Sequence, residues 1–436
     1  MESKVAPIFK YKYGILLREG GRYKVAKKLH EEVLEEQKQV LGNNHADTLR
    51  TMESLALSYS ALGEYQEAKE LQIIVLKRHK QVLGENHQDT LRAIGNLAVS
   101  YTDLGEHRRA QELEVMVLEK QKQVLGENHP GTLRTMGRLA VTYTHLGEHQ
   151  RAKELKLTVL EKQKQILDES HPDTLRTMGN LANSYSALGE YQEAKELNAI
   201  VLEKCKQVLG ENHPDTLRTM GNLAISYTQL GEHRRAKELN VVVLEKQTQV
   251  LGENHPDTLR TMGNLAIPYT QLGEHRRAKE LNVVVLEKQT QVLGDSHPGT
   301  LRTMGRLAAS YAHLGEHRRA KELNVVVLEK QTQVLGNNHP DTLHTMGNLA
   351  SSYSDLGEHQ KGQELKSVVL EKQNQLLGEN HPHTLDTMCS LAVSYSDLGE
   401  HQKAKELRVL ALEKRKEVLG DNHPDTREIA ELLGSV

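Results

Sequence analysis

Apolar residues recur at helical spacing along most of this chain, and residues 213–254 show the pattern clearly. A first set is spaced three or four positions apart, at Leu217, Met220, Leu223, Ala224, Tyr227 and Leu230. After a break, a second set follows at Ala236, Leu239, Val242, Val243 and Val250. The two sets predict two amphipathic helices, each with one face directed toward a core.

The residues around these sets indicate where each helix begins and ends. Pro214 suits a first helical turn, where its missing N–H has no partner, and Asp215 favours the positive end of the helix dipole. Gly231 and Gly252 supply the backbone freedom needed to leave the first and the second helix. Residues 213–254 are therefore predicted to form a helical hairpin with short connections.

The same pattern repeats every 42 residues. The recurrence is marked by histidines at His45, His87, His129, His171, His213, His255, His297, His339, His381 and His423. We expect nine hairpins over residues 45–422, preceded by a divergent capping unit at 1–44 and followed by a capping half unit at 423–436. Because one hairpin leaves apolar residues uncovered, stability must come from stacking, and the chain is predicted to be an all-α solenoid.

Charge and composition exclude several classes of protein. The 436 residues contain 56 Lys and Arg against 59 Asp and Glu, so the chain lacks the basic surface that nucleic-acid binding requires. Cys205 and Cys389 lie more than four units apart and are not expected to meet in a linear array, which fits a reducing compartment. No stretch has the length of a membrane span, and no secretory signal is evident, so we expect a cytoplasmic protein without a membrane partner.

The spacing of Leu223-Ala224, Tyr227, Gly231 and Ala236 closely resembles the tetratricopeptide repeat (TPR) signature. Asn222 together with residues 251–257, Leu-Gly-Glu-Asn-His-Pro-Asp, resembles the 42-residue version found in kinesin light chains and in the repeat arrays of fungal nucleotide-binding receptors. The resemblance covers essentially the whole chain. It implies a right-handed superhelix whose first helices line a concave groove that holds extended peptides or partner surfaces.

In this family the residue before the Leu-Ala pair of each first helix faces the groove and holds the backbone amides of a peptide. Here the position is occupied by Asn96, Asn180, Asn222, Asn264, Asn348, Arg138 and Arg306, with Ser54 and Ser390 in the remaining units. An amide side chain both donates and accepts hydrogen bonds, so a row of them can hold an extended backbone without dictating its sequence. The alternative is that these side chains are only the polar side of an amphipathic helix.

An arginine recurs four residues before the groove position. The row consists of Arg50, Arg92, Arg134, Arg176, Arg218, Arg260 and Arg302. Residues four apart share one helix face, so the groove is predicted to be cationic over its first seven units. An acidic ligand is the natural complement, because Arg binds carboxylates in a bidentate manner. The alternative is that each Arg only pairs with a neighbouring acidic side chain.

A glycine precedes the groove position in seven units, as in Gly179 and Gly221. A glycine inside a helix costs about 0.8–1 kcal/mol relative to alanine, so a compensating role is expected. Two roles fit the pattern: tight packing against the preceding unit, or open space on the groove floor for a ligand side chain.

One residue is expected to disturb the array. Units 213–254 and 255–296 differ at three positions, one of which is Ser226 in the first unit and Pro268 in the second. Proline there leaves the carbonyl of Asn264 without its helical hydrogen bond. A local kink and a cost of about 3 kcal/mol are predicted.

No catalytic centre, metal site or cofactor site is predicted. The chain lacks HExxH, GxSxG and phosphate-loop motifs, and no unit gathers its histidines at metal-ligand spacing. The 23 histidines are assigned to loops and caps, and many are expected to become charged near pH ~5.5.

These features favour a non-enzymatic scaffold that binds an extended, acidic peptide or a partner protein in its groove. Two alternatives remain open. The chain is a structural spacer or self-assembling homo-oligomer, or it is the ligand-sensing repeat arm of a receptor-type ATPase system whose ATPase lies elsewhere.

Overall fold

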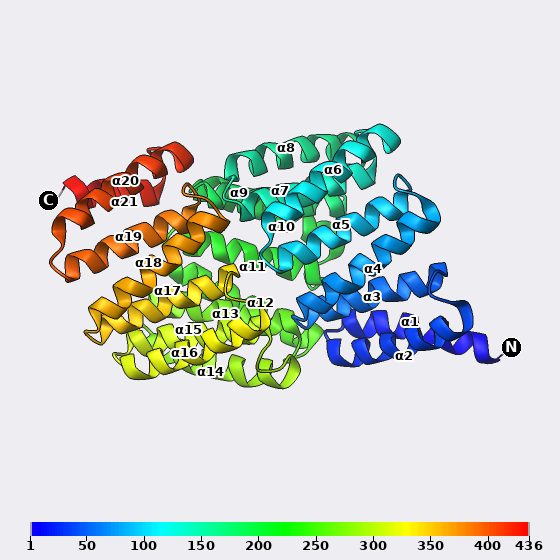
Figure 1. The fold of residues 1–436 in the computed structure, drawn as a ribbon, viewed down its shortest axis with the longest axis horizontal. Helices are drawn as coiled ribbons and strands as arrows, with labels where there is room; N and C mark the ends of the chain where they lie inside the picture. Colours follow the sequence, from blue (N-terminus) through cyan, green and yellow to red (C-terminus); the bar gives the residue numbers. More distant parts are fainter. Residues whose placement is uncertain (1, 435–436) are drawn as a thin grey trace.

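The computed structural model describes residues 2–434, and within these residues every regular element is an α-helix (Figure 1). Met1 and residues 435–436, which belong to the two predicted capping units, lie outside the described residues. The first helices of the units are α1 (Glu2–Glu19), α3 (Ala46–Ala61), α5 (Gln88–Asp103), α7 (Pro130–His145), α9 (Pro172–Ala187), α11 (Pro214–Gln229), α13 (Pro256–Gln271), α15 (Pro298–His313), α17 (Pro340–Asp355), α19 (Pro382–Asp397) and α21 (Pro424–Gly434). The second helices are α2 (Tyr23–Leu41), α4 (Tyr65–Leu83), α6 (His107–Leu125), α8 (His149–Ile166), α10 (Tyr191–Leu209), α12 (His233–Leu251), α14 (His275–Val292), α16 (His317–Val334), α18 (His359–Leu376) and α20 (His401–Leu419).

The recurrent histidine is the N-cap of the first helices from α3 to α19. In α11, Nδ1 of His213 accepts a hydrogen bond of 3.2 Å from the backbone N–H of Asp215. The hydroxyl of Thr216 then donates to the carbonyl of Gly210 at 2.8 Å and closes the connection from the preceding unit. Histidine thus takes the N-cap role that Ser or Asp usually has, because it accepts a hydrogen bond from a backbone N–H of the first turn that has no partner within the helix.

Apolar side chains fill the space between successive units, as predicted. Leu217, Met220 and Leu223 of α11 pack with Val243 of α12 and with Leu202 from the preceding unit. The predicted second-helix stripe was wrong at two positions, because Val242 and Val250 are 40% and 46% exposed. The core is therefore shared between neighbours, which explains why a single hairpin cannot complete it.

The first helices lie on the inner side of the curved array. Every helix packs against the next one along the chain, but the closest contacts between helices two apart join α1 with α3, α7 with α9, and α9 with α11. All of these are first helices. Because the elements on the inside of a curve approach one another most closely, the second helices form the outer layer.

The array curves so tightly that its successive turns touch along a line that we call the seam. In each unit, the hairpin turn between the first and second helix carries a glycine with positive φ, and five of these glycines meet the His-Pro start of a unit further along. The pairs are Gly21 with Pro256, Gly63 with Pro298, Gly105 with Pro340, Gly147 with Pro382, and Gly189 with Pro424. The seam therefore joins helices of the first superhelical turn, such as α3 and α5, to helices of the next turn, such as α15 and α17. The two termini lie at opposite ends of the long axis (Figure 1).

Histidine side chains join the two sides of the seam by hydrogen bonds. Nε2 of His297, His339 and His381 lies 3.2, 3.2 and 3.1 Å from the carbonyls of Ala61, Asp103 and His145. Nδ1 of the same rings accepts from a backbone amide, so the proton must be on Nε2, which donates to the carbonyl. Each neutral ring therefore caps its own helix through Nδ1 and binds the previous superhelical turn through Nε2.

We expect the substitution Gly105→Ala to destabilise the protein by about 1–2 kcal/mol more than Gly315→Ala. Both glycines have nearly the same φ, 73° and 76°, so both variants lose about 1 kcal/mol to the left-handed backbone. A Cβ at Gly105 would overlap with Cδ of Pro340, whereas no described heavy atom comes within 4 Å of a Cβ at Gly315. Urea unfolding of the two variants measures the difference, and equal costs would show that the seam is open in solution.

Pro268 does not interrupt its helix. α13 has the same length as α11, 16 residues, and the amide of Leu272 donates to the carbonyl of Pro268 at 3.0 Å. The visible loss is a side-chain hydrogen bond between units. Ser226 accepts from Nδ2 of Asn198 at 3.0 Å, but the equivalent Asn240 faces Pro268 and donates to its own helix at Ala236 instead.

Candidate functional site

Each first helix presents one exposed stripe on the inner side of the array. In α11 the stripe consists of Arg218, Asn222, Ile225 and Gln229, which are four, three and four residues apart and so share a helix face. Ile225 is 44% exposed, although the neighbouring Leu223 and Ala224 are buried. An aliphatic side chain kept in solvent beside an amide and a guanidinium is a surface able to contact both the backbone and the side chains of a ligand.

The arginines of the stripe are mostly neutralised by their own helix. An aspartate three residues earlier forms an ion pair with the arginine in five units: Asp47 with Arg50, Asp89 with Arg92, Asp173 with Arg176, Asp215 with Arg218, and Asp257 with Arg260. These N–O distances lie between 2.7 and 3.1 Å. The expectation of a cationic groove over seven units was therefore wrong for these five. The aspartate that stabilises the first turn of each helix also neutralises the arginine.

Two units differ from the others in charge. Gly131 and Gly299 replace the aspartate, and Arg138 and Arg306 replace the asparagine of the groove position. Among the described residues, Arg134, Arg138 and Arg306 have no acidic partner within 4.0 Å, while Arg302 lies 3.4 Å from Asp341 of the next unit. Burial lowers the pKa of Arg138, an effect that Glu114 opposes. Positive charge is thus concentrated at these two units.

The glycine row provides open space in most units. Around Gly137, Gly179, Gly221, Gly305 and Gly347, no described heavy atom lies within 4 Å of an added Cβ. Gly95 and Gly263 differ, because the guanidinium of Arg138 or Arg306 from the following unit occupies this space. Packing against the preceding unit therefore does not explain the glycines, and the two units with a groove arginine use the recess for that side chain.

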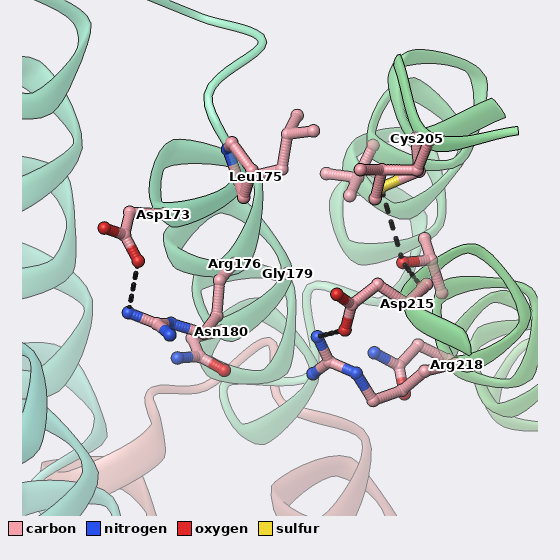
Figure 2. Close-up of a pocket in the computed structure, with 13 residues that line it drawn as sticks. Asp173, Leu175, Arg176, Gly179, Asn180, Cys205, Asp215 and Arg218 are labelled. Carbon is pink, nitrogen blue, oxygen red and sulfur yellow. Dashed lines mark hydrogen bonds and ion pairs between the residues drawn. The ribbon is translucent and has the colours of Figure 1, made fainter. Parts of the chain in front are cut away.

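Four of the predicted site residues come together in one pocket between α9 and α11 (Figure 2). Arg176 and Asn180 line it from α9, Arg218 and Asn222 from α11, and Gly179 forms part of its floor. The pocket has a volume of about 110 Å³ and reaches back to Cys205 of α10, whose thiol pKa is raised by burial. Figure 2 shows both arginines held by the dashed ion pairs to Asp173 and Asp215.

The remaining predicted residues occupy the same positions on other first helices. Arg92, Arg134, Arg260 and Arg302 are exposed, whereas the groove-position residues are half-buried at Asn96, Arg138, Asn264, Arg306 and Asn348. Sequence reasoning did not assign Asp173 and Asp215 to the site, although an acid three residues before an arginine is a recognisable helical pair. Cys205 had no such signal, because it enters the pocket from a different helix.

Comparisons with known proteins agree with this architecture. One tetratricopeptide repeat model matches residues 8–72, 54–123, 139–199, 173–241 and 341–407, and a second matches 258–299 and 300–341. This chain belongs to the tetratricopeptide repeat family. No match was found among curated proteins.

Several solved structures are similar to this TPR protein. A kinesin light chain-like protein of Podosopora anserina with nearly identical TPR-like repeats is 33% identical over 47% of this chain and 97% of its own, with a TM-score of 0.40. Rap protein complexed with Competence and Sporulation Factor is 12% identical over 86% of this chain and 99% of its own, with a TM-score of 0.56. NprR in complex with its cognate peptide NprX is 20% identical over 67% of this chain and 81% of its own, with a TM-score of 0.46.

Two further observations concern the residues that the structure describes. None of their helices combines the length and apolar character required to cross a bilayer. No three His, Cys, Asp or Glu side chains in this part of the chain are grouped as ligands of a metal ion would be.

Proposed function

We propose that this TPR protein is a non-enzymatic scaffold that holds an extended peptide segment of a partner along the inner stripes of its first helices. The observation that carries the proposal is the row of half-buried amides on successive first helices, three of which, Asn180, Asn222 and Asn348, follow a glycine with open space around it. Amides at successive units match the backbone of an extended chain, and the recesses provide room for its side chains. The Rap structure, of similar fold, contains a bound factor and is consistent with this role.

The distribution of charge favours particular units as the binding positions for acidic residues of such a peptide. The five units with internal Asp–Arg pairs offer a neutral stripe, so they suit polar or apolar ligand residues. Two units have guanidinium groups without an acidic partner among the described residues: Arg134 and Arg138 in one unit, and Arg306 in the other. Acidic side chains of the ligand are therefore expected at these two units, because a partly buried guanidinium gains most from an added carboxylate.

Binding of a peptide library displayed on phage tests the proposal. We expect the wild-type protein to select peptides. The double variant Asn180→Ala/Asn222→Ala should bind a selected peptide about thirtyfold more weakly, since each of the two lost hydrogen bonds is worth about 1 kcal/mol. The exposed loop residue Asn212 provides the control, because Asn212→Ala removes an amide outside the stripe. Fluorescence anisotropy gives the affinities. Equal affinities for the wild type and the double variant would contradict the proposal.

A further inference from the structure

The seam is a repeated interface between two kinds of edge. One edge is formed by hairpin turns, each with a glycine at positive φ, and the other by unit starts, each with a capping histidine and a proline. Basic side chains beside the hairpin turns also cross the seam: Lys24 approaches Gly294, and Arg108 approaches Gly378 at the end of α18. A cation is favourable there because the C-terminal end of a helix carries partial negative charge.

Both kinds of edge recur, unpaired, at the two ends of the superhelix. The C-terminal ring, as we call it, consists of the hairpin turns at Gly231, Gly273, Gly315, Gly357 and Gly399, around which no described heavy atom lies within 4 Å of an added Cβ. The N-terminal ring consists of the unit starts at His45, His87, His129, His171 and His213. The exposed fraction of the histidine side chain distinguishes free starts from seam starts: it is 42%, 44% and 40% at His45, His87 and His213, but 11% and 5% at His255 and His423.

The two rings carry complementary charge. Arg234, Arg276 and Arg318 of the C-terminal ring occupy the position that Arg108 has at the seam, and within the described residues they have no acidic partner. The N-terminal ring presents Glu85, Glu127, Glu169 and Glu211, which are 53–69% exposed and each form an ion pair with a lysine of the following unit. Glu379 at the seam is paired with Lys414 in the same way. At the seam itself, Arg108 lies next to the loop that contains Glu379. The rings therefore match each other as the two sides of the seam do.

We propose that the protein associates end to end with a second copy of itself, the C-terminal ring of one copy docking on the N-terminal ring of the next. This contact continues the intramolecular seam, because it joins the same hairpin turns to the same kind of unit start. Three unit starts of the N-terminal ring have a proline, Pro130, Pro172 or Pro214, whose side chain would pack on a turn glycine. The other two starts have Ala46 and Gln88 at this position, without a proline side chain. Since the two surfaces differ, the association is head to tail and does not close after two copies.

Sedimentation velocity of the full chain over a range of concentrations tests this proposal. At low salt we expect the weight-average mass to rise above the monomer value of 49.1 kDa as the concentration increases. High salt should return it toward the monomer, because exposed charges are screened. A monomer at every concentration in low salt would overturn the proposal.

Charge reversal identifies the surfaces. The variant Arg234→Glu/Arg276→Glu/Arg318→Glu has two acidic ends, and Glu127→Lys/Glu169→Lys/Glu211→Lys has two basic ends, so each alone should remain monomeric. An equimolar mixture should assemble again, because an acidic end of one variant meets a basic end of the other. Glu119→Lys/Glu161→Lys/Glu245→Lys changes charge at exposed mid-helix positions of the outer layer and should assemble like the wild type. Assembly by either single variant, no assembly by the mixture, or loss of assembly in this control would each overturn the proposal.

Discussion

Replacing Pro268 by serine is expected to stabilise the protein by about 3 kcal/mol. The substitution restores the backbone N–H that the carbonyl of Asn264 lacks as a partner, and it removes the contact of the proline ring with the preceding turn. It also provides Asn240 with a hydroxyl, in the arrangement that Asn198 and Ser226 adopt with an N–O distance of 3.0 Å. Urea unfolding followed by circular dichroism measures the gain.

Matched variants separate the backbone effect from the side-chain effect. Pro268→Ala restores the N–H alone, so it should fall short of Pro268→Ser by about 1 kcal/mol, the usual value of one hydrogen bond. The reverse change, Ser226→Pro in the nearly identical unit before, should destabilise by a similar amount to the gain at Pro268. No change for either Pro268→Ser or Ser226→Pro would show that the helix accommodates proline here without loss.

Lowering the pH from 7 to about 4.5 is expected to cost on the order of 3 kcal/mol of unfolding free energy. Burial lowers the pKa of His107 to about 3, and it lowers the pKa of His149 and of His381 to about 4, from the ordinary value of 6.5. Below pH 6.5 these histidines are therefore protonated in the unfolded chain but remain neutral in the folded chain. The stability present at neutral pH is lost as the pH falls toward 4. Protonation also removes a helix cap, because a protonated His381 can no longer accept the amide hydrogen bond at Nδ1.

Two buried acids act in the opposite direction. Burial raises the pKa of Glu114 to about 7 and that of Asp103 to about 6, so the folded state binds these protons first and gains stability as the pH falls. Glu114→Gln removes one of these contributions, and its acid destabilisation should be steeper than that of the wild type. Urea midpoints at several pH values test both statements. A wild-type midpoint that is independent of pH between 7 and 4.5 would contradict the expectation, as would a Glu114→Gln slope no steeper than the wild type.

These pKa shifts also correct an expectation drawn from the sequence. Counting histidines suggested that many would become charged near pH ~5.5. The sequence could not show which of them are desolvated, because His107 is buried by helices that the seam brings near it from distant units, including the region of His339 and His381. Burial by residues more than 200 positions away leaves no local signal.

The sequence predicted the residues of the candidate site but not their charge state. Asn180, Asn222, Arg176 and Arg218 were recognised because they recur at fixed positions of a recurring helix, and they do meet in one pocket. The net charge around them was not predicted, although Asp173 and Asp215 lie only three residues before the arginines. Whether such an arginine turns to its own aspartate or toward a ligand depends on rotamers, which a sequence pattern does not specify.

The sequence by itself determined the all-α class, the 42-residue period, the hairpin boundaries and the stacking of neighbours. These follow from local forces: helical periodicity, histidine and proline at the helix start, and glycine at the turns. Only the tertiary structure decided that the array curves tightly enough for Gly105 to meet Pro340, and hence which histidines are neutral and which edges remain free. That curvature is the sum of small rotations between successive units, so it is a property of the whole stack and of no single repeat.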